Sequence, residues 1–253
     1  MIPALGHARA PARPRRVAAW SRVAAELVAG LGPLLVVTGS TAWWFELPAT
    51  YLLRAVGIYA LVCVLVIRHL PATRPRRGLG AANHVTLVRT GLILSVAALV
   101  PQSQILHDTG YWWIIAVTTI ALLLDGVDGW VARQTGTSSP FGARFDMELD
   151  SFLMLVLAAL VWRSGRVAPW VLLLGLPRYL FVAAGWRWPW LRTRLPERLR
   201  RKAGCVLQGI ALLVCLGPIV PPALATVVAA LTLLLLLSSF ALDIVWLSNH
   251  GRS

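Results

Sequence analysis

Long apolar runs alternate with short, arginine-rich polar segments along most of this chain. A transmembrane helix needs roughly 20 apolar residues to cross about 30 Å of hydrocarbon. The pattern predicts eight such spans, at about residues 24–41, 51–67, 85–100, 111–131, 142–162, 169–185, 204–220 and 223–247. The first is the weakest, because Pro33 and several glycines interrupt it. We therefore predict an all-α integral membrane protein.

Composition supports this class and limits the partners. Of the 253 residues, 58% are hydrophobic, and the net charge is +14. Nearly all of the positively charged residues are arginines. The arginines lie in short runs between apolar segments, which is typical of loops that face anionic lipid, so we expect a lipid bilayer and no nucleic acid as partner. Cys63, Cys205 and Cys215 show no metal-binding or redox spacing, so neither a zinc site nor a disulfide framework is predicted.

The placement of the arginines predicts the orientation. Arginine runs precede the first span, follow the second and separate the sixth from the seventh. Eight spans with both termini in the cytoplasm place all three runs on the cytoplasmic side, as the positive-inside rule requires. The arginine-rich, lysine-poor composition and the compact length favour a bacterial plasma membrane.

Residues 1–45 also allow a second interpretation, as a signal peptide, because a basic region precedes a short apolar run. No convincing small-residue cleavage site follows, and the next span is close. We therefore expect a retained membrane anchor.

Four carboxylates interrupt the apolar pattern between the fourth and fifth spans. Asp125 and Asp128 are three residues apart, and Asp146 and Asp150 are four apart, so each pair shares one face of a helix. The short loop 134–141 predicts that the two helices are antiparallel neighbours joined on the cytoplasmic side. Ionisable groups at membrane depth are costly, so the convergence of four predicts a functional site.

Carboxylates at this density require cations to remain ionised. Oxygen ligands without histidine or cysteine favour Mg²⁺, with Mn²⁺ or Ca²⁺ as alternatives. Two such ions can bridge a diphosphate and neutralise the charge on its leaving group. Gly129 and Ala132 keep one face of the fourth helix bare for a nucleotide, and Arg133 lies one turn further on, where it can meet phosphate.

Two structural interpretations compete with this one. The pairs Asp125-Gly126 and Asp128-Gly129 can mark the end of a helix, and Asp146 and Asp150 can form structural salt bridges with Arg133 and Arg144. Each explains one pair of carboxylates, but neither explains the whole arrangement.

The complete motif is Asp-x2-Asp-Gly-x2-Ala-Arg-x8-Gly-x3-Asp-x3-Asp, over residues 125–150. It resembles the signature of the CDP-alcohol phosphatidyltransferases at every position. The resemblance extends over about residues 80–247 and implies that family's six-helix bundle. It divides the chain into a basic N-terminal segment with two additional transmembrane helices, residues 1–78, and a six-helix catalytic membrane domain, residues 79–253.

The resemblance also implies a reaction and the residues that perform it. An acceptor alcohol would attack the β-phosphorus of a CDP-alcohol, most simply CDP-diacylglycerol, and release CMP in phospholipid synthesis. Asp150 would be the general base, and a homodimer is expected. The implied metal ligands are Asp125, Asp128, Asp146 and Asp150, binding two Mg²⁺ or Mn²⁺ ions, and the implied CDP-binding residues are Gly129, Ala132, Arg133 and Gly142.

Outside the motif the resemblance is weaker. Asn83, Thr86 and Arg89 resemble a juxtamembrane pattern of the family that faces the nucleotide entrance, although helix capping and a snorkelling arginine would give the same pattern. Arg178, in mid-span, would bind acceptor phosphate or form a structural ion pair, and Lys202 resembles a basic element near the acceptor. The residues around these positions depart from those of glycerophosphate-using relatives, so the acceptor remains open.

Two other functions are compatible with clustered carboxylates. A membrane cation carrier would use them along an ion pathway, and an inactive scaffold would retain the fold alone. The acids gather beside one loop, no acidic relay continues across the membrane, and all four aspartates are intact. We therefore predict an enzyme.

Overall fold

The computed structural model describes residues 13–69, 81–135, 140–188 and 199–250, and these ranges are helical apart from short connections. The elements, in chain order, are α1 (Arg13–Trp44), α2 (Ala49–His69), α3 (Ala81–Leu99), η2 (Val100–Ile105), α4 (Asp108–Thr135), α5 (Pro140–Arg163), η3 (Pro169–Val171), α6 (Leu172–Gly175), α7 (Pro177–Arg187), α8 (Leu199–Leu216) and α9 (Pro222–His250). The predicted all-α fold is confirmed.

Five described helices are long and apolar enough to cross a membrane. They are Val23–Trp44 in α1, Ala49–His69, Val85–Ile105 through α3 and η2, Asp108–Gly126 in α4, and Pro222–Trp246 in α9. Pro33 lies inside a continuous α1, so it does not interrupt this span as the sequence had indicated. Each of the other predicted spans also falls on helix. However, α5 carries four charged residues in its first half, and the apolar part of α8, Ala203–Leu216, is short.

The sixth predicted span is broken rather than straight. α6 and α7 meet at an angle of 66°, and they count as a sixth span only if they are taken together. The break falls at Leu176, immediately before Pro177. Proline lacks the N–H that would continue the helical hydrogen bonds, although Leu176 itself keeps helical dihedral angles. The sequence therefore contained a helix-breaking residue at this point, although the prediction treated the span as continuous.

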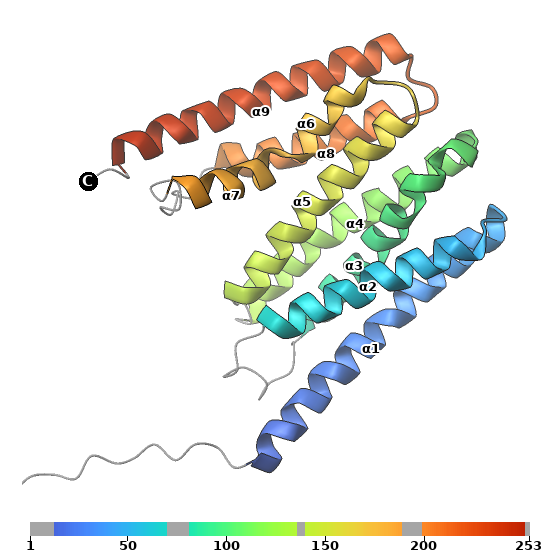
Figure 1. Cartoon of the computed structure of the whole chain (residues 1–253), viewed down its shortest axis with the longest axis vertical. Helices are drawn as coiled ribbons and strands as arrows, with labels where there is room; N and C mark the ends of the chain where they lie inside the picture. Colours follow the sequence, from blue (N-terminus) through green and yellow to red (C-terminus); the bar gives the residue numbers. More distant parts are fainter. Residues whose placement is uncertain (1–12, 70–80, 136–139, 189–198, 251–253) are drawn as a thin grey trace, which may run out of the picture.

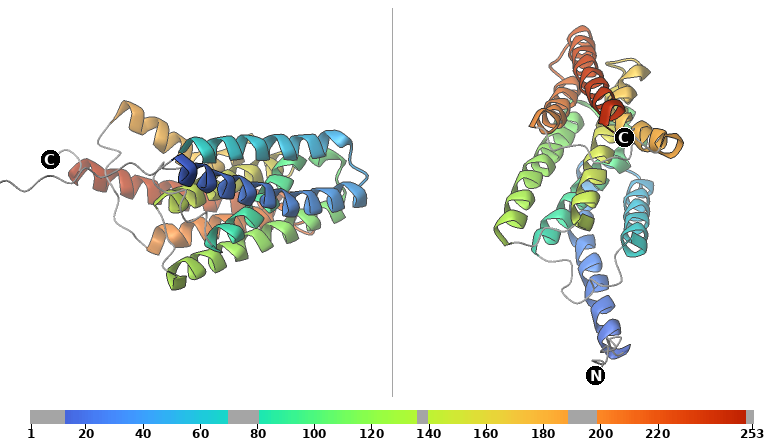
Figure 2. Two further views of the ribbon diagram at one scale, coloured as in Figure 1. Left: turned by 90° about the horizontal axis from the view of Figure 1, so that it is seen from below. Right: turned by 90° about the vertical axis from the view of Figure 1, so that its left-hand side faces the viewer.

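Helix α3 lies at the centre of the arrangement. In Figure 1, α1 and α2 lie on one side of α3–α5, and α8 and α9 lie on the other. α3 packs against α1, α2, α4 and α5. In the apolar stretch of its membrane span 72% is buried, compared with 17% for the span in α9. In the right-hand view of Figure 2, α3 lies between α4 and α5. Residues on α3 can therefore contact several other helices at once.

The first two helices are bound to this core by polar contacts as well as by apolar packing. Tyr51 on α2 donates a hydrogen bond to the Ser95 carbonyl of α3 at 3.2 Å. Trp113 on α4 donates from Nε1 to Thr41 Oγ1 of α1 at 3.0 Å. Glycine at position 91 allows close packing, because a Cβ there would lie 3.0 Å from the backbone nitrogen of Leu34. α1 and α2 are thus an integral part of the bundle.

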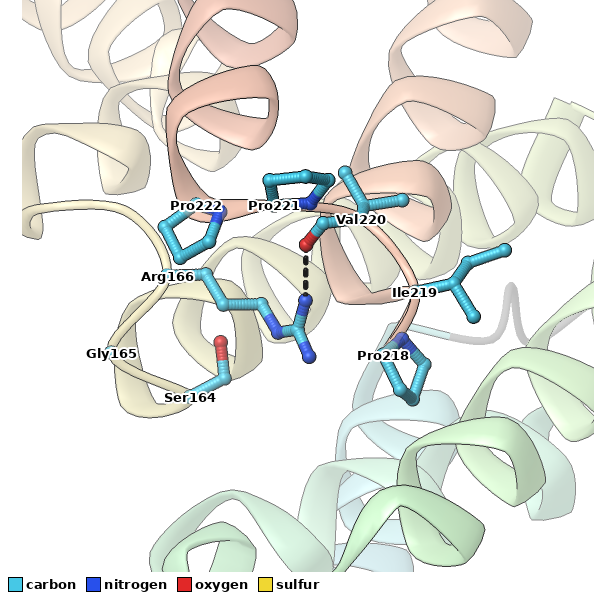
Figure 3. Close-up of a pocket in the computed structure, with 8 residues that line it drawn as sticks. All are labelled: Ser164, Gly165, Arg166, Pro218, Ile219, Val220, Pro221 and Pro222. Carbon is cyan, nitrogen blue, oxygen red and sulfur yellow. Dashed lines mark hydrogen bonds between the residues drawn. The ribbon is translucent and has the colours of Figure 1, made fainter.

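At the end of α5 remote from the aspartates, Arg166 joins two loops. Its NH1 donates to the carbonyls of Gly217 and Val220 at 2.7 and 2.8 Å, which ties the segment after α5 to the α8–α9 connection. Figure 3 shows Arg166 directed toward that connection, beside Pro221 and Pro222. The groups that it contacts are backbone carbonyls, so this contact is structural.

Close packing of α6 against α5 gives a first testable prediction. A Cβ at Gly175 would lie 2.5 Å from the Leu155 Cα, and backbone cannot move aside as a flexible side chain can. We expect Gly175→Ala to destabilise the protein by about 1–3 kcal/mol, the usual cost of overpacking. Thermal unfolding in detergent checks this.

The matched control is Gly57→Ala, in mid-helix on α2, where a Cβ would meet nothing within 4 Å. Alanine is favoured over glycine inside a helix by about 1 kcal/mol, so this variant should be at least as stable as the wild type. Equal unfolding temperatures for the two variants would contradict the tight packing of α6.

Candidate active site

Three aspartates from two helices converge at one end of the bundle. Asp125 lies on α4, and Asp146 and Asp150 lie one turn apart on α5. One carboxylate oxygen of each lies within 4.8 Å of the others. The predicted convergence of the two pairs is therefore confirmed for these three, and the side chain of Asp128 lies outside the described residues.

The helices reach this site differently from the prediction. α4 and α5 were expected to pack as antiparallel neighbours, but in the described ranges α4 packs mainly along α3, whereas α5 packs mainly on α6 and α8 and also contacts α3. The carboxylates of the two helices meet around Arg89 of α3. α4 and α5 are held apart because α3 lies between them. The short loop between α4 and α5, on which the prediction was based, does not show this.

The local sequence explains how each helix presents its acids. α4 continues to Thr135, so Asp125-Gly126 and Asp128-Gly129 lie inside the helix and do not mark its end. α5 begins at Pro140, and proline is favoured at the first helical position because it needs no hydrogen bond to its nitrogen there. The interpretation of these Asp-Gly pairs as a helix terminus is therefore wrong.

Arg89 on α3 contacts all three carboxylates. Its NH1 lies 2.7 Å from Asp125 Oδ1 and also pairs with Asp146 Oδ1, while its NH2 pairs with Asp150 Oδ1. The side chain is 0% exposed, whereas the three aspartate side chains are 37–38% exposed. The arginine thus reaches the carboxylates from the buried side and leaves them accessible from the other side.

Sequence reasoning did not assign this role to Arg89. The pattern of Asn83, Thr86 and Arg89 was interpreted either as the nucleotide entrance or as capping with a snorkelling arginine. A side chain with no exposed surface does not snorkel, so the second interpretation is wrong for Arg89. The available signal was a lone arginine inside an apolar helix, which requires a buried anionic partner.

The remaining predicted residues are distributed around this centre. Thr86 on α3 and Gly142 on α5 are half-buried near the same helix ends. Six other predicted residues have side chains that lie outside the described part of the chain. They are Asp128, Gly129, Ala132, Arg133, Asn83 and Lys202. Their assigned roles stay predictions.

Arg178 has a partner on the neighbouring element. Its Nε and NH2 both donate to the Glu148 carboxylate, which joins α7 to α5. Glu148 lies between Asp146 and Asp150 in the sequence but on a different face of the helix. This is the ion pair that the sequence left open as an alternative to acceptor binding. The pair is partly exposed, with Glu148 54% accessible, so binding of an acceptor by Arg178 stays a prediction.

The donor set fits a divalent metal. Asp125, Asp146 and Asp150 offer only oxygen atoms, which suit hard cations such as Mg²⁺ and Mn²⁺. Their separation allows one ion to contact oxygens of all three. The partial exposure of the carboxylates supplies an access path. These three residues can therefore hold a metal ion.

Comparison with known proteins agrees with this geometry. The family model described as CDP-alcohol phosphatidyltransferase matches residues 79–239, and no solved structure matches the chain. The chain belongs to the CDP-alcohol phosphatidyltransferase family. It is thus a membrane transferase of a metal-dependent family, with the aspartate cluster at the position of the catalytic motif. The matched region begins after α2, so the first two helices precede the family domain, as predicted.

Proposed function

We propose that this protein transfers a substituted phosphate group from CDP-diacylglycerol to a polar alcohol and releases CMP, as a step of phospholipid synthesis. The observation that carries the proposal is the convergence of Asp125, Asp146 and Asp150 within 4.8 Å at the end of a membrane bundle. Diacylglycerol is favoured as the alcohol of the donor because its acyl chains can remain in the bilayer while the nucleotide lies at the helix ends.

The chain's own residues have separate roles in this reaction. Asp150 accepts the proton of the acceptor hydroxyl, so that its oxygen can attack the β-phosphorus. Asp125, Asp128, Asp146 and Asp150 would hold two Mg²⁺ ions, and such ions would supply positive charge to offset that of the diphosphate and of the CMP leaving group. Gly129, Ala132, Arg133 and Gly142, with Asn83 and Thr86 from α3, form the nucleotide pocket.

The acceptor approaches from the side of α7 and α8. Arg178 on α7 and Lys202 on α8 supply positive charge there, which suits an acceptor bearing phosphate. The Arg178–Glu148 pair would then open as acceptor phosphate replaces the Glu148 carboxylate. The arginine runs support a cytoplasmic location of this site, the arginine-rich, lysine-poor composition favours a bacterial plasma membrane, and the resemblance to the family favours a homodimer.

The test is CMP release by purified protein with CDP-diacylglycerol and Mg²⁺. Candidate acceptors are glycerol 3-phosphate, inositol phosphate, inositol, serine and phosphatidylglycerol. We expect release with one of them and loss of release on addition of EDTA. Tight CDP binding without release would indicate a different acceptor or CDP-alcohol. Absence of both binding and release would overturn the proposal and favour a cation carrier or a scaffold.

A further inference from the structure

Arg89 is a buried cation at the point where three helices meet. It belongs to α3, and its partners Asp125 and the pair Asp146 and Asp150 belong to α4 and α5. With 0% exposure, its charge is removed from solvent, which is tolerated only when opposite charges or hydrogen bonds compensate it. The burial of the Arg89 charge therefore depends on the three neighbouring carboxylates.

We propose that Arg89 is a positioning residue for the divalent-cation site. It holds Asp125, Asp146 and Asp150 together from the buried side, so that their open side can accept a metal ion. The proposal rests on the proposed function only in taking this cluster to be a divalent-cation site. It adds a residue that does not itself touch the metal or the substrate.

Electrostatic repulsion explains why such a residue is required. Three carboxylates with oxygens within 4.8 Å repel one another and would separate unless a cation lies among them. Arg89 supplies that cation at a fixed place, since α3 is the most buried of the candidate spans in the described ranges. The three carboxylates and Arg89 together carry two net negative charges, which one divalent ion neutralises.

The shape of the guanidinium matches the arrangement of the carboxylates. NH1 serves Asp125 and Asp146, and NH2 serves Asp150. NH1 thus joins α4 to α5, and NH2 holds the second carboxylate of α5, whereas a lysine offers a single nitrogen for all three carboxylates. These ion pairs use Oδ1 of each carboxylate, and the arginine that they contact is fully buried. Partners of this kind orient metal ligands, and their loss typically weakens metal binding.

A different role for Arg89 makes the opposite prediction. If the guanidinium stood in the place of the metal, it would compete with the ion for the carboxylates, and its removal would tighten binding. The exposures argue against this, because the arginine is buried while the carboxylates are 37–38% exposed. Metal affinity therefore distinguishes a supporting role from a competing one.

The experiment measures Mn²⁺ binding to the full chain in detergent, without nucleotide, by calorimetry or by the electron paramagnetic resonance of free Mn²⁺. We expect Arg89→Gln to weaken binding by about tenfold, within the usual effect of losing a ligand-orienting partner. The Mg²⁺-induced rise in unfolding temperature should shrink in parallel, because that rise depends on affinity. Arg89→Lys keeps the charge without the fork, and should lie between the wild type and Arg89→Gln.

Arg166→Gln is the matched control. It removes a partly buried arginine at the other end of α5, where the partners are backbone carbonyls. It should lower the unfolding temperature with and without metal and leave Mn²⁺ affinity unchanged. If Arg89→Gln does not fold, Arg89→Lys supplies the measurement.

Unchanged or tighter Mn²⁺ binding in the Arg89 variants, with normal binding by the wild type, would overturn the positioning role alone. A wild-type protein that binds no Mn²⁺ would overturn both this role and the metal site of the proposed function. The two failures are therefore distinguishable.

Discussion

Asp150→Asn should reduce CMP release by about 100-fold to 10⁴-fold, the contribution typical of a general base. Asparagine retains the size of the side chain and can still accept a hydrogen bond from Arg89, but it cannot take the proton of the acceptor hydroxyl. Asp125 and Asp146 remain in place and the asparagine still offers an amide oxygen to the metal, so metal-dependent binding of the CDP-lipid should fall much less than turnover. The measurement is turnover beside equilibrium binding of the CDP-lipid, each with Mg²⁺ and with EDTA.

The matched control for this variant is Asp108→Asn. Asp108 is an exposed aspartate in the first turn of α4, at the opposite end of that helix from Asp125. This change should leave both turnover and binding close to wild type. Near-full activity of Asp150→Asn would show that another group acts as the base.

Asp125→Asn is expected to impair binding as well as turnover. This residue is the described contribution of α4 to the cluster, and the side chain would lose the negative charge that helps to hold a divalent ion. Loss of a metal-orienting partner typically costs 10–100-fold in affinity, so loss of a ligand should cost about 100-fold or more. Mn²⁺ affinity, CDP-lipid binding and CMP release should therefore fall together.

The contrast between the two variants is the informative result. If Asp125→Asn lost turnover but kept full Mn²⁺ affinity, Asp125 would not be a metal ligand. Raising the Mg²⁺ concentration should recover more of the activity of Asp125→Asn than of Asp150→Asn, because added metal cannot replace the missing base.

Helix positions could be predicted because they depend on local patterns. Runs of apolar residues of membrane-spanning length placed α1–α5, α8 and α9 close to their observed positions. The break at Leu176 could not be predicted in the same way. Proline is tolerated within a continuous α1 at Pro33 but ends a helix before Pro177. Which outcome occurs depends on the neighbouring helices that satisfy the backbone.

The pattern of apolar residues does not show how the first two helices pack against the rest of the bundle. Their apolar sequences predicted only that they enter lipid. The contacts of Tyr51 with α3 and of Thr41 with α4 join them to the family domain. The motif gave no indication of this, because it lies within α4 and α5.

The sequence by itself determined the class of protein and the acids of its site. Their helical spacing is a local property, and the motif over residues 125–150 is specific enough to identify the family that the comparison confirmed. Only the tertiary structure decided what holds those acids together. Arg89 is 36 residues from Asp125 and 61 from Asp150 in the chain, and no spacing rule connects them. The packing of α4 and α5 on α3 brings the arginine beneath the carboxylates, and burial then requires the charges to pair.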